Sequence, residues 1–107
     1  MRKTFKSILF IALGILYTNI AAYAAGDPEL GKLKADTCLG CHGIPSYKNV
    51  YPTYTVPKVA GQYEEYIVAA LKAYQSGERN HKTMRAQSST LSEEDMVNIG
   101  AYFESLK

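Results

Sequence analysis

Two thiols and an imidazole stand close together in the sequence, at Cys38, Cys41 and His42. They form a C-x-x-C-H motif, which is typical of a site where a haem is attached covalently. The two thiols add across the vinyl groups of such a haem, and the imidazole that follows binds the iron as its proximal ligand. The motif therefore predicts thioether bonds at Cys38 and Cys41 and an iron ligand at His42.

Three other structures could use the same thiols. A disulfide would close a loop over only two intervening residues, which constrains an unfolded chain little. A thioredoxin-like redox pair belongs between a strand and a helix of a βαβ unit, and the sequence shows no such pattern. A zinc site needs four ligands, and beyond the motif only His81 remains among the usual nitrogen and sulfur donors. The haem interpretation is favoured over all three.

The beginning of the chain has the pattern of a secretory signal peptide. Residues 1–24 carry three basic residues within the first six, then an apolar stretch, then small residues ending in Ala22-Tyr23-Ala24. The uninterrupted apolar stretch has about ten residues, whereas a membrane span needs about twenty. We therefore expect cleavage after Ala24 and an exported, periplasmic domain of residues 25–107 without a stable membrane anchor.

Composition and charge narrow the class of protein further. With 107 residues, 47% of them hydrophobic, the chain has room for one small globular domain. Its net charge of +2 comes from the basic residues of the expected signal peptide. Residues 25–107 carry nine basic and ten acidic side chains, which gives them a net charge of −1. Nothing in this balance indicates a nucleic-acid partner. A domain this small has a marginal apolar core, so a bound cofactor is expected to stabilise it.

Three helices are predicted to position the motif. The first begins at Asp27, a capping residue followed by Pro28, and runs towards Cys38. The second covers residues 62–76, with apolar residues at helical spacing and Gly77 as its terminator. The third covers residues 92–106 and begins with a capping box. The segment 43–59 is rich in proline and tyrosine and is expected to be an ordered loop, so the fold is all-α.

Small residues suggest how two of these helices meet. Gly31 and Ala35 on the first helix and Gly100 and Ala101 on the last are spaced to allow a close crossing. A glycine inside a helix costs about 1 kcal/mol relative to alanine, so such a crossing would offset that cost.

The sixth iron ligand has four candidates: Met84, Met96, His81 or an open position. Met96 lies in the first turn of the last helix, on its apolar face, and is expected in the core. Met84 lies in a polar segment without amphipathic periodicity, which we expect to be a loop folding over the haem. Met84 is the favoured ligand, and His81 is expected to be a solvent-exposed loop residue.

The ordered spacing of these motifs resembles that of class I bacterial cytochromes c with a single haem, related to the domains of di-haem periplasmic cytochromes. The residues that carry the resemblance are Gly31, Cys38 to Gly43, Pro57 to Gln62, Tyr66, Leu71, Gly77 to Arg79, Met84, Leu91, Ser92 and Ala101 to Phe103. The resemblance implies three main helices plus loops wrapped around one covalently attached haem c. It also implies that the Pro57 carbonyl accepts a hydrogen bond from the ring of His42, and that Val59 packs on the porphyrin.

By the same resemblance, the function is periplasmic electron transfer with His42 and Met84 as axial ligands. Redox partner proteins would dock transiently at the haem edge, with His81, Lys82 and Arg85 as a positive rim. The alternatives are a haem subunit of a larger periplasmic oxidoreductase or a protein with an open iron that binds gases or peroxide. Residues that could contact the haem propionates are Arg79, Tyr54 and Gln62. The segment 44–47 departs from the glycine-rich turn expected of the group.

Overall fold

The structure is a computed structural model that describes residues 25–50 and 53–107. The expected signal peptide, Tyr51 and Pro52 lie outside the described residues. Within the described residues there are five helices and no strand, which confirms the all-α class. The helices are α2 (Pro28–Lys34), α3 (Asp36–His42), α4 (Glu64–Ser76), α5 (Lys82–Ser88) and α6 (Glu93–Ser105). No helix among these is long and apolar enough to cross a membrane.

Local signals explain where α2 and α6 begin and where α4 ends. The Asp27 carboxylate accepts hydrogen bonds from the backbone of Glu29 and Leu30 at the start of α2. Gly77 ends α4 in the left-handed region with φ of 83°. Ser92 and Asp95 form the predicted capping box of α6.

The first predicted helix is interrupted at Ala35. Its backbone has φ of −80° and ψ of 0°, which separates α2 from α3. Ala35 is fully buried in the core. The interruption divides the segment that packs on α6 from the segment that carries the C-x-x-C-H motif.

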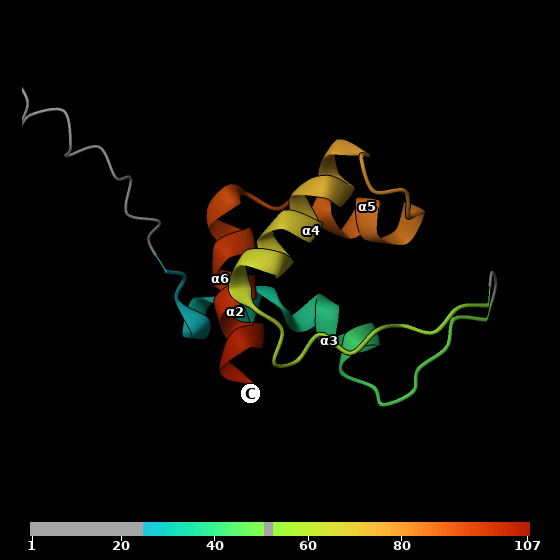
Figure 1. Cartoon of the computed structure of the whole chain (residues 1–107), viewed down its shortest axis with the longest axis horizontal. Coiled ribbons are helices and arrows are strands. Elements are labelled where there is room, and N and C mark those ends of the chain that lie inside the picture. Colours follow the sequence, from blue (N-terminus) through green and yellow to red (C-terminus); the bar gives the residue numbers. More distant parts are fainter. Residues whose placement is uncertain (1–24, 51–52) are drawn as a thin grey trace, which may run out of the picture.

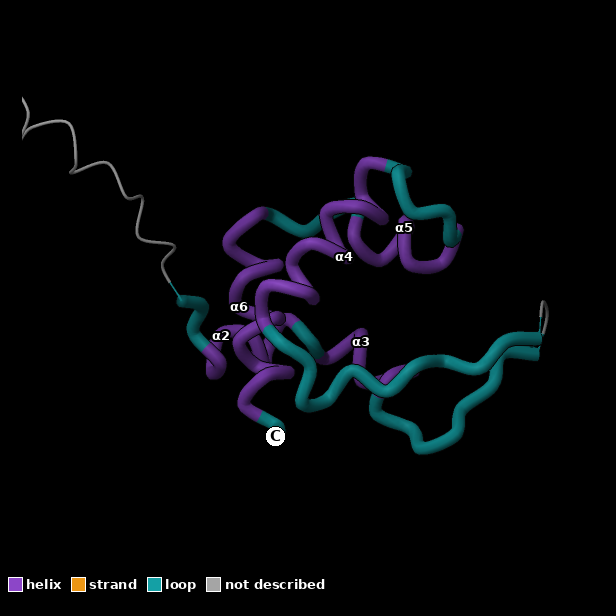
Figure 2. Tube along the Cα trace, viewed as in Figure 1, coloured by secondary structure: helices purple, strands orange, loops and turns teal. Residues whose placement is uncertain are grey.

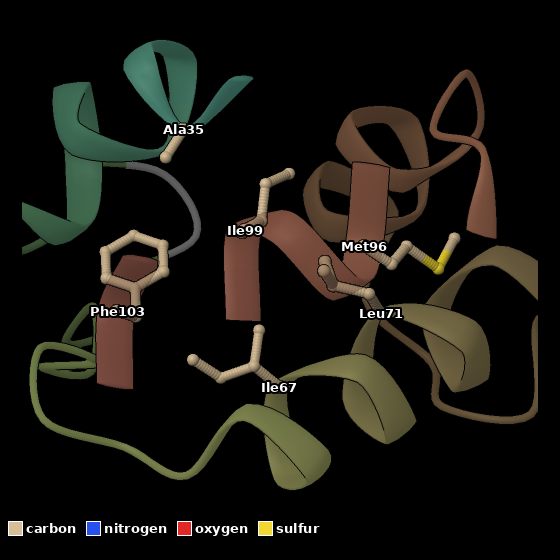
Figure 3. Packing of buried hydrophobic residues seen from close by; sticks show 6 residues of the cluster. All are labelled: Ala35, Ile67, Leu71, Met96, Ile99 and Phe103. Carbon is tan, nitrogen blue, oxygen red and sulfur yellow. The ribbon is translucent and has the colours of Figure 1, made fainter. Parts of the chain in front are cut away.

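The core lies where α6 packs against α2 and α4 (Figure 1). Figure 3 shows side chains of α4 and α6 gathered with the one from the α2–α3 junction. The buried cluster consists of Ala35, Ile67, Leu71, Met96, Ile99 and Phe103. Met96 is only 1% exposed, so its predicted place in the core is confirmed.

Two glycines permit close contacts, but with different helices. A Cβ atom on Gly31 would lie 1.8 Å from the Asn98 carbonyl oxygen of α6. A Cβ atom on Gly100 would lie 2.9 Å from the Glu64 carbonyl oxygen of α4. The expected crossing of α2 and α6 therefore exists at Gly31, whereas Gly100 serves the contact of α6 with α4.

The segment 43–59 extends from the helices as a loop (Figure 2). An isolated antiparallel bridge between Lys48 and Thr55 joins its two sides. The Asn49 amide donates to the Tyr54 carbonyl at 2.9 Å, next to this bridge. We call the segment the 43–59 loop, and its return side leads into the site described below.

Candidate functional site

Helix α3 places the three residues of the motif on the wall of one cavity. Cys38 and Cys41 are three positions apart, so their side chains lie on the same face of the helix. Both are free thiols, Cys38 half-buried and Cys41 exposed. His42, the last residue of α3, is half-buried beside them.

The imidazole of His42 is held from the 43–59 loop. Its Nδ1 atom lies 2.7 Å from the carbonyl oxygen of Pro57, which is the contact that the family resemblance implies. A carbonyl can only accept, so Nδ1 carries the ring proton and Nε2 is left with its lone pair. A hydrogen bond of this kind fixes the orientation of a ligating imidazole and strengthens it as a donor. Nε2 is therefore the atom of His42 that is prepared to bind a metal.

The cavity has a volume of about 570 Å³. This lies within the range of about 300–1,000 Å³ typical of ligand and cofactor sites. Its wall comes from α3, the 43–59 loop, α4, the segment leading into α5, α5 itself, and α6. Apolar and aromatic side chains make up much of it, namely Val56, Val59, Tyr66, Ile67, Ala70, Leu71, Tyr74, Ile99 and Phe103. Val59 is half-buried and packs against the core cluster.

Met84 also lines the cavity, but from a helix and not from a loop. The sequence-based expectation of a loop at this point is wrong, because residues Lys82–Ser88 form α5. The prediction missed α5 because its residues have no apolar periodicity. A tertiary contact holds its end, where Gln75 Nε2 of α4 donates to the carbonyls of Ser88 and Leu91, both at 2.9 Å. Met84 is half-buried, with its side chain packed against the core cluster.

His81 is not the exposed loop residue that the sequence suggested. It is half-buried and forms the N-cap of α5, where its Nδ1 accepts from the Met84 amide at 3.3 Å. Its ring meets Tyr54 and Tyr74 edge to face, with centroid distances of 4.9 and 6.1 Å. The hydrogen bond to Met84 is local, but the two aromatic neighbours come from other segments of the chain. Spacing in the sequence could therefore not indicate that the His81 ring is half-buried.

The three side chains considered for propionate contacts all line the cavity. The Arg79 guanidinium lies 4.8 Å from the centre of the Tyr74 ring. A hydrogen bond with Tyr66 raises the pKa of Arg79, so its charge is retained. Tyr54 packs on His81, and the Gln62 Oε1 atom accepts from the adjacent Tyr63 amide at 3.0 Å. Arg79 is thus the cationic member of this group at the cavity.

Burial raises the pKa of the Cys38 thiol, and a hydrogen bond with Thr37 opposes this in part. Catalytic redox thiols have a lowered pKa, so this environment does not favour a thioredoxin-like pair. Among the described residues, no group of three or more His, Cys, Asp or Glu side chains could hold a metal ion. The donor set instead fits a haem, with two thiols for covalent attachment, an oriented imidazole, and a thioether on another wall.

Comparison with protein-family models matches residues 29–107 to the family described as Cytochrome c. The chain belongs to the cytochrome c family. Members of this family carry a covalently bound haem c and transfer electrons.

Curated relatives of this cytochrome c include both longer and equally short proteins. It is 36% identical to cytochrome c4 of Pseudomonas aeruginosa over the whole chain, which spans 50% of that protein. It is 37% identical to cytochrome c-554(548) of Halomonas halodenitrificans over 76% of the chain and 98% of that protein. It is 31% identical to the thiosulfate dehydrogenase electron acceptor of Thiomonas intermedia, over 95% of the chain and 45% of that protein. This cytochrome c therefore spans about half the length of the first and third of these relatives.

Proposed function

We propose that this chain carries one electron at a time on a single haem c, with His42 and Met84 as the axial ligands. One observation carries the proposal: the oriented imidazole of α3 and the thioether of α5 line the same cavity. Helices α3 and α5 make no backbone contact with each other. A group bound in the cavity between them would contact both donors.

The roles of the chain's own residues follow from this arrangement. Cys38 and Cys41 would form thioether bonds and hold the group against α3. His42 would bind the iron through Nε2 while Pro57 keeps its ring in place, and Val59 would provide apolar packing. When bound, the haem supplies an iron that alternates between its ferric and ferrous states. Because the His42 ring is held by Pro57 and the Met84 backbone by the cap of α5, little rearrangement would accompany the change of charge.

Absorption spectroscopy and intact mass of the exported protein, with Met84→Ala alongside, test this proposal. We expect one covalently added haem per chain and an absorption band from thioether-to-iron coordination. Met84→Ala should keep the covalent mass and lose the band, because only the axial ligand is removed. A colourless product from a host with a working haem-attachment apparatus would contradict the proposal.

We also propose that residues 1–24 are removed on export and that residues 25–107 act in the periplasm. The proposal is supported by the leader pattern, which lies outside the described residues. The mass of the exported protein tests it directly, since cleavage after Ala24 leaves Ala25 as the first residue.

Redox proteins with an acidic docking face are the partners we propose. Among the residues that the structure describes, no carboxylate lines the cavity, whereas Lys58 and Arg79 do. Lys82 and Arg85 flank Met84 and are absent from the ion pairs of the described residues. The positive electrostatic potential of these basic side chains would speed association with an acidic partner more than it would stabilise the complex. His81 is engaged as the N-cap of α5 through Nδ1, so the proposed rim is tested at Lys82 and Arg85.

The rim can be tested by its salt dependence. Lys82→Gln combined with Arg85→Gln should weaken the dependence of electron delivery on ionic strength. Lys32→Gln on α2 is the matched control, because Lys32 does not line the cavity. Equal salt dependence of all three proteins would refute the positive rim.

A second candidate is a role as the electron-accepting subunit of a larger oxidoreductase. It is favoured by the relative named as an electron acceptor of thiosulfate dehydrogenase. Stable co-purification with an enzyme subunit would support this role over that of a free carrier. A gas-binding role requires an open iron, so rapid carbon monoxide binding to the reduced protein would support that alternative.

A further inference from the structure

Helix α5 is a short element that its own sequence does not explain. It has seven residues, and isolated helices shorter than about 12 residues are marginal in water. Its residues show no apolar stripe that would press it onto the core. Besides Met84, which packs against the core cluster, contacts at its two ends hold it in place.

At the C-terminal end of α5, the contact comes from α4. The side-chain amide of Gln75 donates to the Ser88 carbonyl and to the Leu91 carbonyl just beyond it. Ser88 itself is fully buried. The two hydrogen bonds from Gln75 therefore fix this end of α5, one helical turn away from Met84, and do not act on Met84 directly.

At the N-terminal end, the contact reaches Met84 itself. The Nδ1 atom of His81 accepts from the backbone amide of Met84, one of the helix-start donors that lack a partner within the helix. Because Nδ1 accepts, the ring proton lies on Nε2. The ring cannot turn freely, since Tyr54 of the 43–59 loop and Tyr74 of α4 both pack against it edge to face.

We propose that His81 is a positioning residue for Met84, holding its backbone so that the thioether stays directed into the cavity. This rests on the proposed function, in which Met84 is an axial ligand. His81 joins three segments at one point: its ring contacts the 43–59 loop and α4, and its nitrogen caps α5. Without the cap, the first turn of α5 can open and Met84 leaves its position more often.

The test compares three variants of the haem-loaded protein by their thioether-to-iron band and by carbon monoxide binding to the reduced form. Carbon monoxide reports the fraction of molecules with Met84 displaced, because apparent affinity scales with the population of the competent state. In His81→Ala this fraction should rise about fivefold, the usual effect of losing an N-cap side chain. His81→Asn should restore most of the band, because asparagine also accepts the capping hydrogen bond.

Ser92→Ala is the matched control, since it removes an N-cap from α6 by the same chemistry. It should lower thermal stability as much as His81→Ala while leaving the band and carbon monoxide binding unchanged. If His81→Ala behaved like Ser92→Ala, or His81→Asn like His81→Ala, the positioning role would be wrong. Met84→Ala separates this failure from that of the proposed function. If Met84→Ala keeps the band, Met84 is not the ligand and both proposals fail; if it loses the band while His81→Ala keeps it, the positioning role alone fails.

Discussion

The two sides of this molecule are held together in different ways. On one side α2, α4 and α6 form a packed core, and each has a capping or terminating signal in its own sequence. On the other side the 43–59 loop and α5 have little apolar periodicity and depend on single contacts from elsewhere, such as Pro57 to His42 and Gln75 to Ser88. We therefore expect the core to support itself, and the segments around the cavity to need both the core and the group bound there.

The largest effect is expected from removing the covalent attachment. Replacing both Cys38 and Cys41 with serine should yield a protein without covalent haem, in which the 43–59 loop and α5 lose order. Helix content by circular dichroism and protease resistance would show the loss. If the double variant kept its full helix content and its resistance to protease, the proposed difference between the two sides would be wrong, because the cavity segments would then need no bound group.

A large effect is also expected within the core. Gly31→Ala should destabilise the haem-loaded protein by about 3 kcal/mol, because the added Cβ would collide with the backbone of Asn98. Gly40→Ala is the matched control on α3, since no atom lies within 4 Å of its added Cβ. It should change stability by at most about 1 kcal/mol, in the favourable direction. Denaturant unfolding measures both, and equal values would refute the close crossing of α2 and α6.

A smaller effect is expected from releasing the far end of α5. Gln75→Leu leaves two carbonyls without their donor and should cost about 2 kcal/mol. The loss should concentrate in α5, as faster hydrogen exchange of its amides than of those in α6. Uniform acceleration across both helices would mean that α5 is as firmly part of the core as α6.

The smallest effect concerns pH. Hydrogen bonding by the Ser92 backbone, and then by Lys34, lowers the pKa of Asp95. A lowered pKa in the folded state adds stability above the unfolded value of about 3.9, and that stability is lost as pH falls further. Asp95→Asn should therefore lose less stability than the unmodified protein between about pH 6 and pH 3. An identical decline in both would show that the α6 capping box contributes nothing to acid sensitivity.

Much of the site was predictable because its chemistry is encoded locally. The thiols and imidazole of the C-x-x-C-H motif are contiguous, and one helical turn suffices to place them together. The capping residues Asp27 and Ser92 and the terminator Gly77 act on their immediate neighbours. The predicted caps at Asp27 and Ser92 and the predicted terminator at Gly77 are confirmed, because each depends only on residues close by in the sequence.

What failed depended on partners distant in the sequence. The end of helix α5 (residues 82–88) accepts a hydrogen bond from Gln75 of α4, and the half-buried cap at His81 packs against Tyr54 and Tyr74. At the break between α2 and α3, Ala35 is buried among core side chains. None of these contacts produces a periodic pattern of apolar residues in the segment that it holds.

The sequence by itself determined the attachment motif, the cytochrome c family, the helices α4 and α6 and the start of α2, because each is encoded by residues a few positions apart. Only the tertiary structure decided that Met84 stands on a helix, that His81 caps it, and that Gly100 faces α4. These outcomes depend on which surfaces meet once the core has formed. Local propensity in a short polar segment is too weak to select one conformation before that packing exists.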